Sequence, residues 1–89
     1  MERVKIRYHA HFSELAENQL EEELFTESKT VGELISELDQ KYPGFREALF
    51  DSLTGELNLR NQILEVTSEA TNIADLKTKI VSGNIYAFW

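Results

Sequence analysis

The sequence contains no cysteine and only one proline among its 89 residues. Without cysteine the chain can form no disulfide and no thiolate metal site, and it has no thiol nucleophile, so its stability must come from packing. The sequence also lacks a long apolar run, since the longest one covers only residues 85–89, and its N-terminus has no apolar targeting core. We therefore expect a cytoplasmic protein that does not bind membranes.

Basic residues are scarce. The chain has 9 lysines and arginines but 16 aspartates and glutamates, which gives a net charge of -7. This charge repels a phosphate backbone, so no nucleic-acid partner is predicted. An acidic balance favours solubility and encounter with a basic patch on another protein. The length fits one small domain over residues 1–89, and 42% hydrophobic with 28% charged residues is ordinary globular composition.

The segment Val4–Phe12 alternates strictly between apolar residues at even positions and polar or charged residues at odd positions. Period-two alternation predicts a strand with one buried face. An extended pattern resumes over Gln19–Phe25, so the two segments should form a hairpin. Because inward faces must agree across the pair, the paired residue numbers should sum to an even value of about 30.

This register places Arg7 and His9 opposite the acidic residues Glu21 and Glu23. Such pairs are each worth only a few tenths of a kcal/mol up to about one, so they set register more than stability. Glu22 lies between inward-facing leucines by parity. We expect a strand edge or a bulge at that position.

A helix should begin at Thr30, because Thr30 and Glu33 have the spacing at which each side chain satisfies an orphan backbone donor. Apolar residues then recur at helical spacing, at Val31, Leu34, Ile35, Leu38 and Tyr42. Pro43-Gly44 should end this helix. A short helical turn is expected next, over residues 45–49.

The second half of the chain predicts two short strands over 57–59 and 63–66, and a terminal strand over 85–89. The polar stretch 67–79 is more typical of a loop with a helical turn. This order leaves one main helix against a mixed sheet of four to five strands, with the first and last strands parallel in its centre. The predicted fold class is therefore α+β, in the β-grasp arrangement.

Two possible chemical sites are weak. His9 and His11 would lie about 6.5 to 7 Å apart on one strand face, but two imidazoles without a third ligand favour a solvated or partner-facing polar stripe over a metal site. Ser13 could pair with His11 as nucleophile and base by proximity only, and a domain this small rarely encloses a pocket. We predict a carrier or binding protein with no catalytic residues, metal or cofactor, rather than an enzyme.

The last strand offers a candidate partner-binding face. By parity Tyr86 and Phe88 face inward, so the opposite face combines aliphatic and indole groups with neighbouring basic side chains, which suits a protein interface. The residues of this face are Ile85, Ala87, Trp89, Arg7 and His9. Alternatively, Trp89 folds back onto its own domain and covers sheet surface.

Several segments together resemble a known family. The opening string Val-Lys-Ile-Arg-Tyr-His-Ala-His-Phe-Ser-Glu-Leu resembles that of MoaD-type small subunits of molybdopterin synthase. Thr-Val-Gly-Glu-Leu at 30–34, Tyr-Pro-Gly at 42–44, and Ser-Gly-Asn-Ile-Tyr-Ala-Phe at 82–88 are similar to further segments of the same family, in the same order. The resemblance covers nearly the whole chain. It implies a ubiquitin-like β-grasp protein of the MoaD/ThiS sulfur-carrier type.

In that family the last strand continues into a Pro-Pro-x-x-Gly-Gly tail, whose carboxylate is adenylated by an activating enzyme and converted to a thiocarboxylate. The sequence stops at Trp89, before such a tail. As written, it is expected to be inactive as a sulfur carrier, because an indole beside the carboxylate would clash with a narrow active-site tunnel.

The resemblance implies a link to molybdopterin synthesis, with an activating enzyme and a large synthase-type subunit as protein partners. Leu64, Phe88 and the outward face of the last strand would form the docking surface. Two alternatives stay open: an interaction module without sulfur chemistry, and a structural domain cut from a longer chain.

Overall fold

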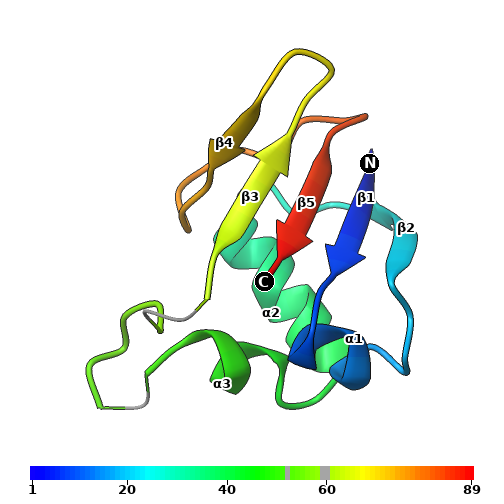
Figure 1. Ribbon diagram of the computed structural model, residues 1–89. Coiled ribbons are helices and arrows are strands. Elements are labelled where there is room, and N and C mark those ends of the chain that lie inside the picture. The colour runs from blue at the N-terminus through cyan, green and yellow to red at the C-terminus, as the bar shows by residue number, and fades with distance from the viewer. Residues whose placement is uncertain (52, 59–60) are drawn as a thin grey trace.

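A mixed sheet with helices on one face forms the body of the protein. The computed structural model describes residues 1–51, 53–58 and 61–89. Within them the strand order is β2-β1-β5-β3-β4. The strands are β1 (Glu2–Tyr8), β2 (Glu21–Thr26), β3 (Ile63–Val66), β4 (Thr71–Ile73) and β5 (Ile85–Phe88). As predicted, the first and last strands lie parallel in the middle of the sheet, and the long helix α2 (Val31–Lys41) crosses behind it (Figure 1).

The hairpin of β1 and β2 has the predicted parity, with a shifted register. Arg7 lies opposite Glu21, one of the two predicted acidic partners, and Lys5 lies opposite the other, Glu23. His9 follows the end of β1, so its predicted place in the hairpin was wrong. The register is continuous through Glu22, which lies on the edge strand β2 and pairs with Ile6 of β1. The predicted strand edge is therefore confirmed, and no bulge interrupts the pairing.

The first strand is shorter than its alternating pattern suggested. It ends at Tyr8, and Ala10 turns the chain with a positive φ of 52° into the short helix α1 (His11–Leu15). The buried residues Phe12 and Ala16 now lie one helical turn apart. His9 and His11 therefore do not share a strand face, contrary to the prediction.

Helix α2 begins and ends as predicted. Thr30 Oγ1 accepts a hydrogen bond from the Glu33 amide at 3.3 Å, and the Glu33 carboxylate accepts one from the Lys29 amide at 2.8 Å. After Tyr42 the chain reverses at Gly44, whose φ of 96° favours glycine. The predicted helical turn follows as α3 (Phe45–Leu49).

The segment between β3 and β5 differs from the prediction. Thr71–Ile73 is not part of a loop with a helical turn but forms β4, which pairs antiparallel with β3. All three residues of this edge strand are exposed, so no alternation revealed it. Leu57 forms an isolated bridge with Phe50 instead of a strand, and Leu59, the predicted end of that strand, lies outside the described residues.

An aromatic cluster joins the end of β5 to the helices. The Phe45 and Phe88 rings meet edge to face with centroids 5.1 Å apart, and Phe12 lies 5.3 Å from Phe45. Tyr8 also contacts Phe45, at 6.0 Å. This packing fixes the sheet centre against α1 and α3. None of the described helices is long and apolar enough to cross a membrane.

Candidate partner-docking surface

The sheet face opposite α2 carries side chains in rows that run across the strands. One row consists of Arg7, Ala87, Leu64 and Ile73, and the next consists of Lys5, Ile85, Val66 and Thr71. We call these eight residues, together with His9 and Trp89, the open face. No described helix packs on this side of the sheet (Figure 1). Apolar side chains on β5 and β3 thus lie beside cations on β1.

The cations of β1 are only partly neutralised. Arg7 Nε lies 3.1 Å from Glu21 Oε1, with both side chains about half exposed. Arg3 makes a similar exposed pair with Glu23 at 3.5 Å. Exposed ion pairs of this kind are each worth at most about 1 kcal/mol, so a partner can exchange them at little cost. A hollow of about 160 Å³ opens on this face, lined in part by Lys5 and Ile85.

Trp89 forms the end of the open face next to His9. The imidazole and indole rings are stacked, with centroids 3.6 Å apart and planes 6° from parallel. Burial lowers the pKa of His9 below its ordinary value, and the nearby Arg7 charge lowers it further. Both effects favour the neutral form of the imidazole. Trp89 keeps 48% of its surface exposed.

The structure brings most of the predicted interface residues together, with two exceptions. Phe88 is 0% exposed and packs in the core, so its predicted place on a docking surface was wrong. Ala87 is on the correct face but only 3% exposed, since it lies between Arg7 and Leu64. Its small side chain lines the floor of the open face instead of projecting from it.

Sequence reasoning missed Ile73, which is 78% exposed and extends the apolar row beyond Leu64. Its strand was not predicted, so its side chain could not be assigned to a face. The available signal was its place as an isolated aliphatic residue in a polar segment. Lys5 was also left out, although its parity matches that of Arg7.

A second cluster lies on the helix side of the sheet, around Glu22. The Tyr8 and Tyr42 hydroxyls each donate to Glu22 Oε1 at 2.8 Å, and the Lys41 ammonium donates to the other carboxylate oxygen. Burial alone would raise the pKa of Glu22, but these three hydrogen bonds together hold it below its ordinary value. Burial and the adjacent Glu22 carboxylate raise the pKa of Tyr8. The cluster is a satisfied structural network, because every group in it has a partner.

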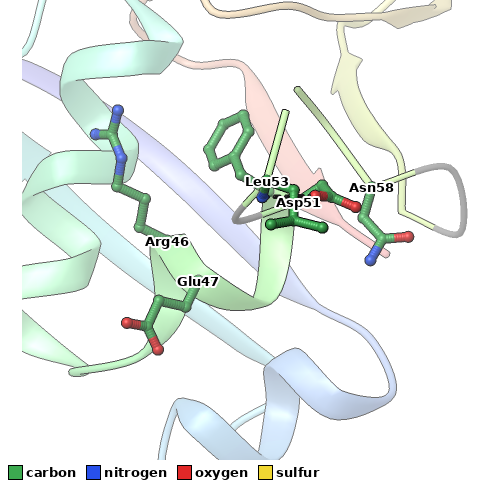
Figure 2. A pocket seen from close by; sticks show the side chains of 6 residues that line it. Arg46, Glu47, Asp51, Leu53 and Asn58 are labelled. Atoms are coloured by element: carbon green, nitrogen blue, oxygen red, sulfur yellow. Dashed lines mark hydrogen bonds between the residues drawn. The ribbon is translucent and has the colours of Figure 1, made fainter. Parts of the chain in front are cut away.

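A hollow of about 670 Å³ lies beside α3 and is open to solvent. Figure 2 shows Arg46 and Glu47 on one side of it and Asn58 on the other. The Asp51 carboxylate accepts hydrogen bonds from the Leu53 and Thr54 amides, so it stabilises its own turn. The described residues that line this hollow include no activated nucleophile.

The other two chemical sites considered from the sequence are the Ser13–His11 pair and a metal site. Ser13 and His11 are two positions apart on α1, a spacing at which helical side chains do not face each other. Among the described residues, no three histidine or acidic side chains lie close enough to hold a metal ion. The His11 ring instead contacts Glu14, at 3.4 Å.

Comparison with known proteins defines the fold. No family profile and no curated protein matches the sequence. Among solved structures, SAMP1 from Haloferax volcanii matches with 19% identity and a TM-score of 0.76, over 98% of this chain and 92% of that one. The fold is a ubiquitin-like β-grasp. The predicted fold class is thereby confirmed.

Two further solved structures match the same fold. CysO from Mycobacterium tuberculosis matches with 21% identity and a TM-score of 0.72, over 97% of this chain and 96% of that one. A Pyrococcus furiosus protein provisionally named molybdopterin converting factor, subunit 1, matches with 21% identity and a TM-score of 0.71, over 99% and 95% of the two chains. The resemblance to MoaD-type proteins inferred from the sequence is therefore borne out in three dimensions, at the level of the fold.

Proposed function

We propose that this chain is a ubiquitin-like protein of the sulfur-carrier type that docks on partner enzymes through its open face. The observation that carries the proposal is the position of β5, whose end lies in the centre of the sheet beside Arg7 and Leu64. The chain that leaves β5 there emerges directly next to the surface that a partner would bind. The proposal makes the chain a carrier acting with enzymes, not an enzyme itself.

The chemistry of such a carrier needs only a terminal carboxylate and a partner that activates it. Adenylation by ATP releases pyrophosphate and turns the carboxylate into a mixed anhydride, and hydrosulfide then attacks the acyl carbon and displaces AMP to leave a thiocarboxylate. The domain itself contributes binding and orientation.

The test begins with the protein isolated from its native source. Intact mass and C-terminal sequencing define the native terminus, and incubation with an activating enzyme, ATP and a sulfur donor should then add the mass difference between oxygen and sulfur. Omitting ATP provides the control. A native protein that ends at Trp89 and forms no thiocarboxylate would refute the proposal.

We further infer that the pathway is molybdopterin synthesis. The supporting observations are the MoaD-like segments of the sequence and the fold shared with the Pyrococcus furiosus protein. The expected partner is the large subunit of a molybdopterin synthase. Binding to that subunit, measured by calorimetry, should be lost with Arg7→Glu. Equal binding of the wild type and this variant would contradict the inference.

A second candidate is a docking module without sulfur chemistry. It is favoured by the engagement of Trp89, whose main chain pairs with Gln62 and whose ring stacks on His9. This module should capture a partner in stoichiometric amounts, and Trp89→Ala or Arg7→Glu should weaken capture at least tenfold, as expected for interface anchors. Arg46→Glu, on α3, is the matched control. A partner that binds all these variants equally well would exclude the open face as its docking site.

A further inference from the structure

Trp89 is held to the sheet by three kinds of contact after β5 has ended. Its amide donates to the Gln62 carbonyl at 3.0 Å, and the Gln62 amide donates back to the Trp89 carbonyl at 3.2 Å. The His9 amide donates to the Phe88 carbonyl at 3.0 Å. The stacked rings of His9 and Trp89 complete the set. The chain leaving β5 is therefore fixed on both sides, by the segment after β1 and by the segment before β3.

The ring stack is separate from the hydrophobic core. Phe88 is the last residue whose side chain packs among the core aromatics, whereas Trp89 is about half exposed. One face of the indole is covered by His9, which belongs to the connection between β1 and α1. Because Trp89 is not part of the buried core cluster, the stack can open without unfolding β5.

The charge state of His9 suits a closed stack. Burial and Arg7 lower its pKa, which favours the neutral imidazole, and a neutral ring is cheaper to desolvate than an ion. Two flat rings at 3.6 Å with nearly parallel planes make close van der Waals contact over their faces. The geometry therefore indicates a specific contact and not a chance approach of two surface side chains.

We propose that His9 and Trp89 form an aromatic clasp that holds the chain leaving β5 against the sheet and opens locally to release it. In the closed state one face of the indole and the main chain of Trp89 are withheld from any partner. In the open state both become available while the β-grasp core stays folded. The clasp goes beyond the proposed function, because it requires no sulfur chemistry.

Trp89 is the only tryptophan in the chain, so its fluorescence reports on the clasp directly. In His9→Ala, acrylamide should quench this fluorescence more efficiently than in the wild type. Amide hydrogen exchange at Trp89 and Gln62 should accelerate about two- to tenfold, the factor that corresponds to loss of one aromatic pair. His9→Phe supplies another flat ring and should restore slow exchange and weak quenching.

His11→Ala is the matched control, because the His11 ring contacts Glu14 and Phe12 on α1. It should leave both measurements at wild-type values. Amides inside β1 and β5 should exchange at wild-type rates in every variant. The proposal is overturned if His9→Ala quenches and exchanges like the wild type, or if its faster exchange spreads evenly through β1 and β5.

Discussion

Glu22 shows how one residue can contradict a local pattern and still fit the fold. Parity places its carboxylate on the helix side of the sheet, where the sequence predicts apolar side chains. There the carboxylate accepts three hydrogen bonds, one from Tyr8 on β1 and two from Lys41 and Tyr42 at the end of α2. The sequence could indicate that Glu22 was anomalous. It could not supply partners that are distant along the chain and meet only in the folded protein.

Replacing this carboxylate should destabilise the protein more than replacing its exposed neighbour. Glu22→Gln keeps the size of the side chain but leaves Lys41 without an anionic partner and supplies weaker acceptors to the two tyrosines. We expect a loss of about 1 to 3 kcal/mol in the free energy of unfolding. Glu23→Gln, which removes only the exposed pair with Arg3, should cost less than about 1 kcal/mol. Urea denaturation at neutral pH measures both.

The difference between the wild type and Glu22→Gln should depend on pH. Because the folded pKa of Glu22 lies below its ordinary value of 4.5, the ionised carboxylate stabilises the fold at pH values above that ordinary value. This stabilisation is lost as the pH falls through the lower folded pKa. The two unfolding curves should therefore converge in acid. A difference that stays constant from neutral pH to acid would assign the effect to packing instead.

At the scale of elements, those with strong local signals were predicted correctly. Helix α2 has a capping residue, an apolar stripe and a proline-glycine stop, so its limits follow from the sequence. The strand β4 has none of these, because its three exposed residues acquire their conformation by pairing with β3. Helix α1 was hidden for another reason: its buried Phe12 continued the alternation of β1, and only the turn at Ala10 breaks the strand.

The cap of α2 can be tested without touching the core. Thr30→Ala removes the hydroxyl that accepts from the Glu33 amide, and the helix should lose about 1 kcal/mol. Thr30→Ser keeps a hydroxyl at the same position and should recover most of that loss. Thermal unfolding followed by circular dichroism compares the three proteins. Equal stability of the alanine and serine variants would show that the hydroxyl does not contribute.

At the scale of the whole molecule, stability depends on a core in which aromatic rings connect the sheet to the short helices. Phe45 is fully buried and contacts Tyr8, Phe12 and Phe88. The core residues of β1, β5 and α2 were predictable from periodicity. The open face could be predicted only in part, because Ile73 reaches it through an edge strand without a sequence signal.

Phe45→Ala should cost about 3 to 5 kcal/mol, because it removes a large buried ring and leaves a cavity. A domain of this size has a total stability on the order of 5 to 10 kcal/mol, so the variant should unfold at a much lower urea concentration. Phe25→Ala makes the same chemical change at a residue that is 60% exposed. It should shift the midpoint only slightly. Similar shifts for both variants would contradict the assigned core.

The central position of β5 also governs when the protein can fold during synthesis. Its partners are β1, made first, and β3, so the middle of the sheet stays empty until residues 85–88 have been translated. Pairing between segments this distant in sequence forms late and slowly. A nascent chain on the ribosome can make the hairpin and α2 early, but both keep an apolar face exposed until β5 leaves the exit tunnel. The β-grasp sheet is therefore completed only after β5 has emerged.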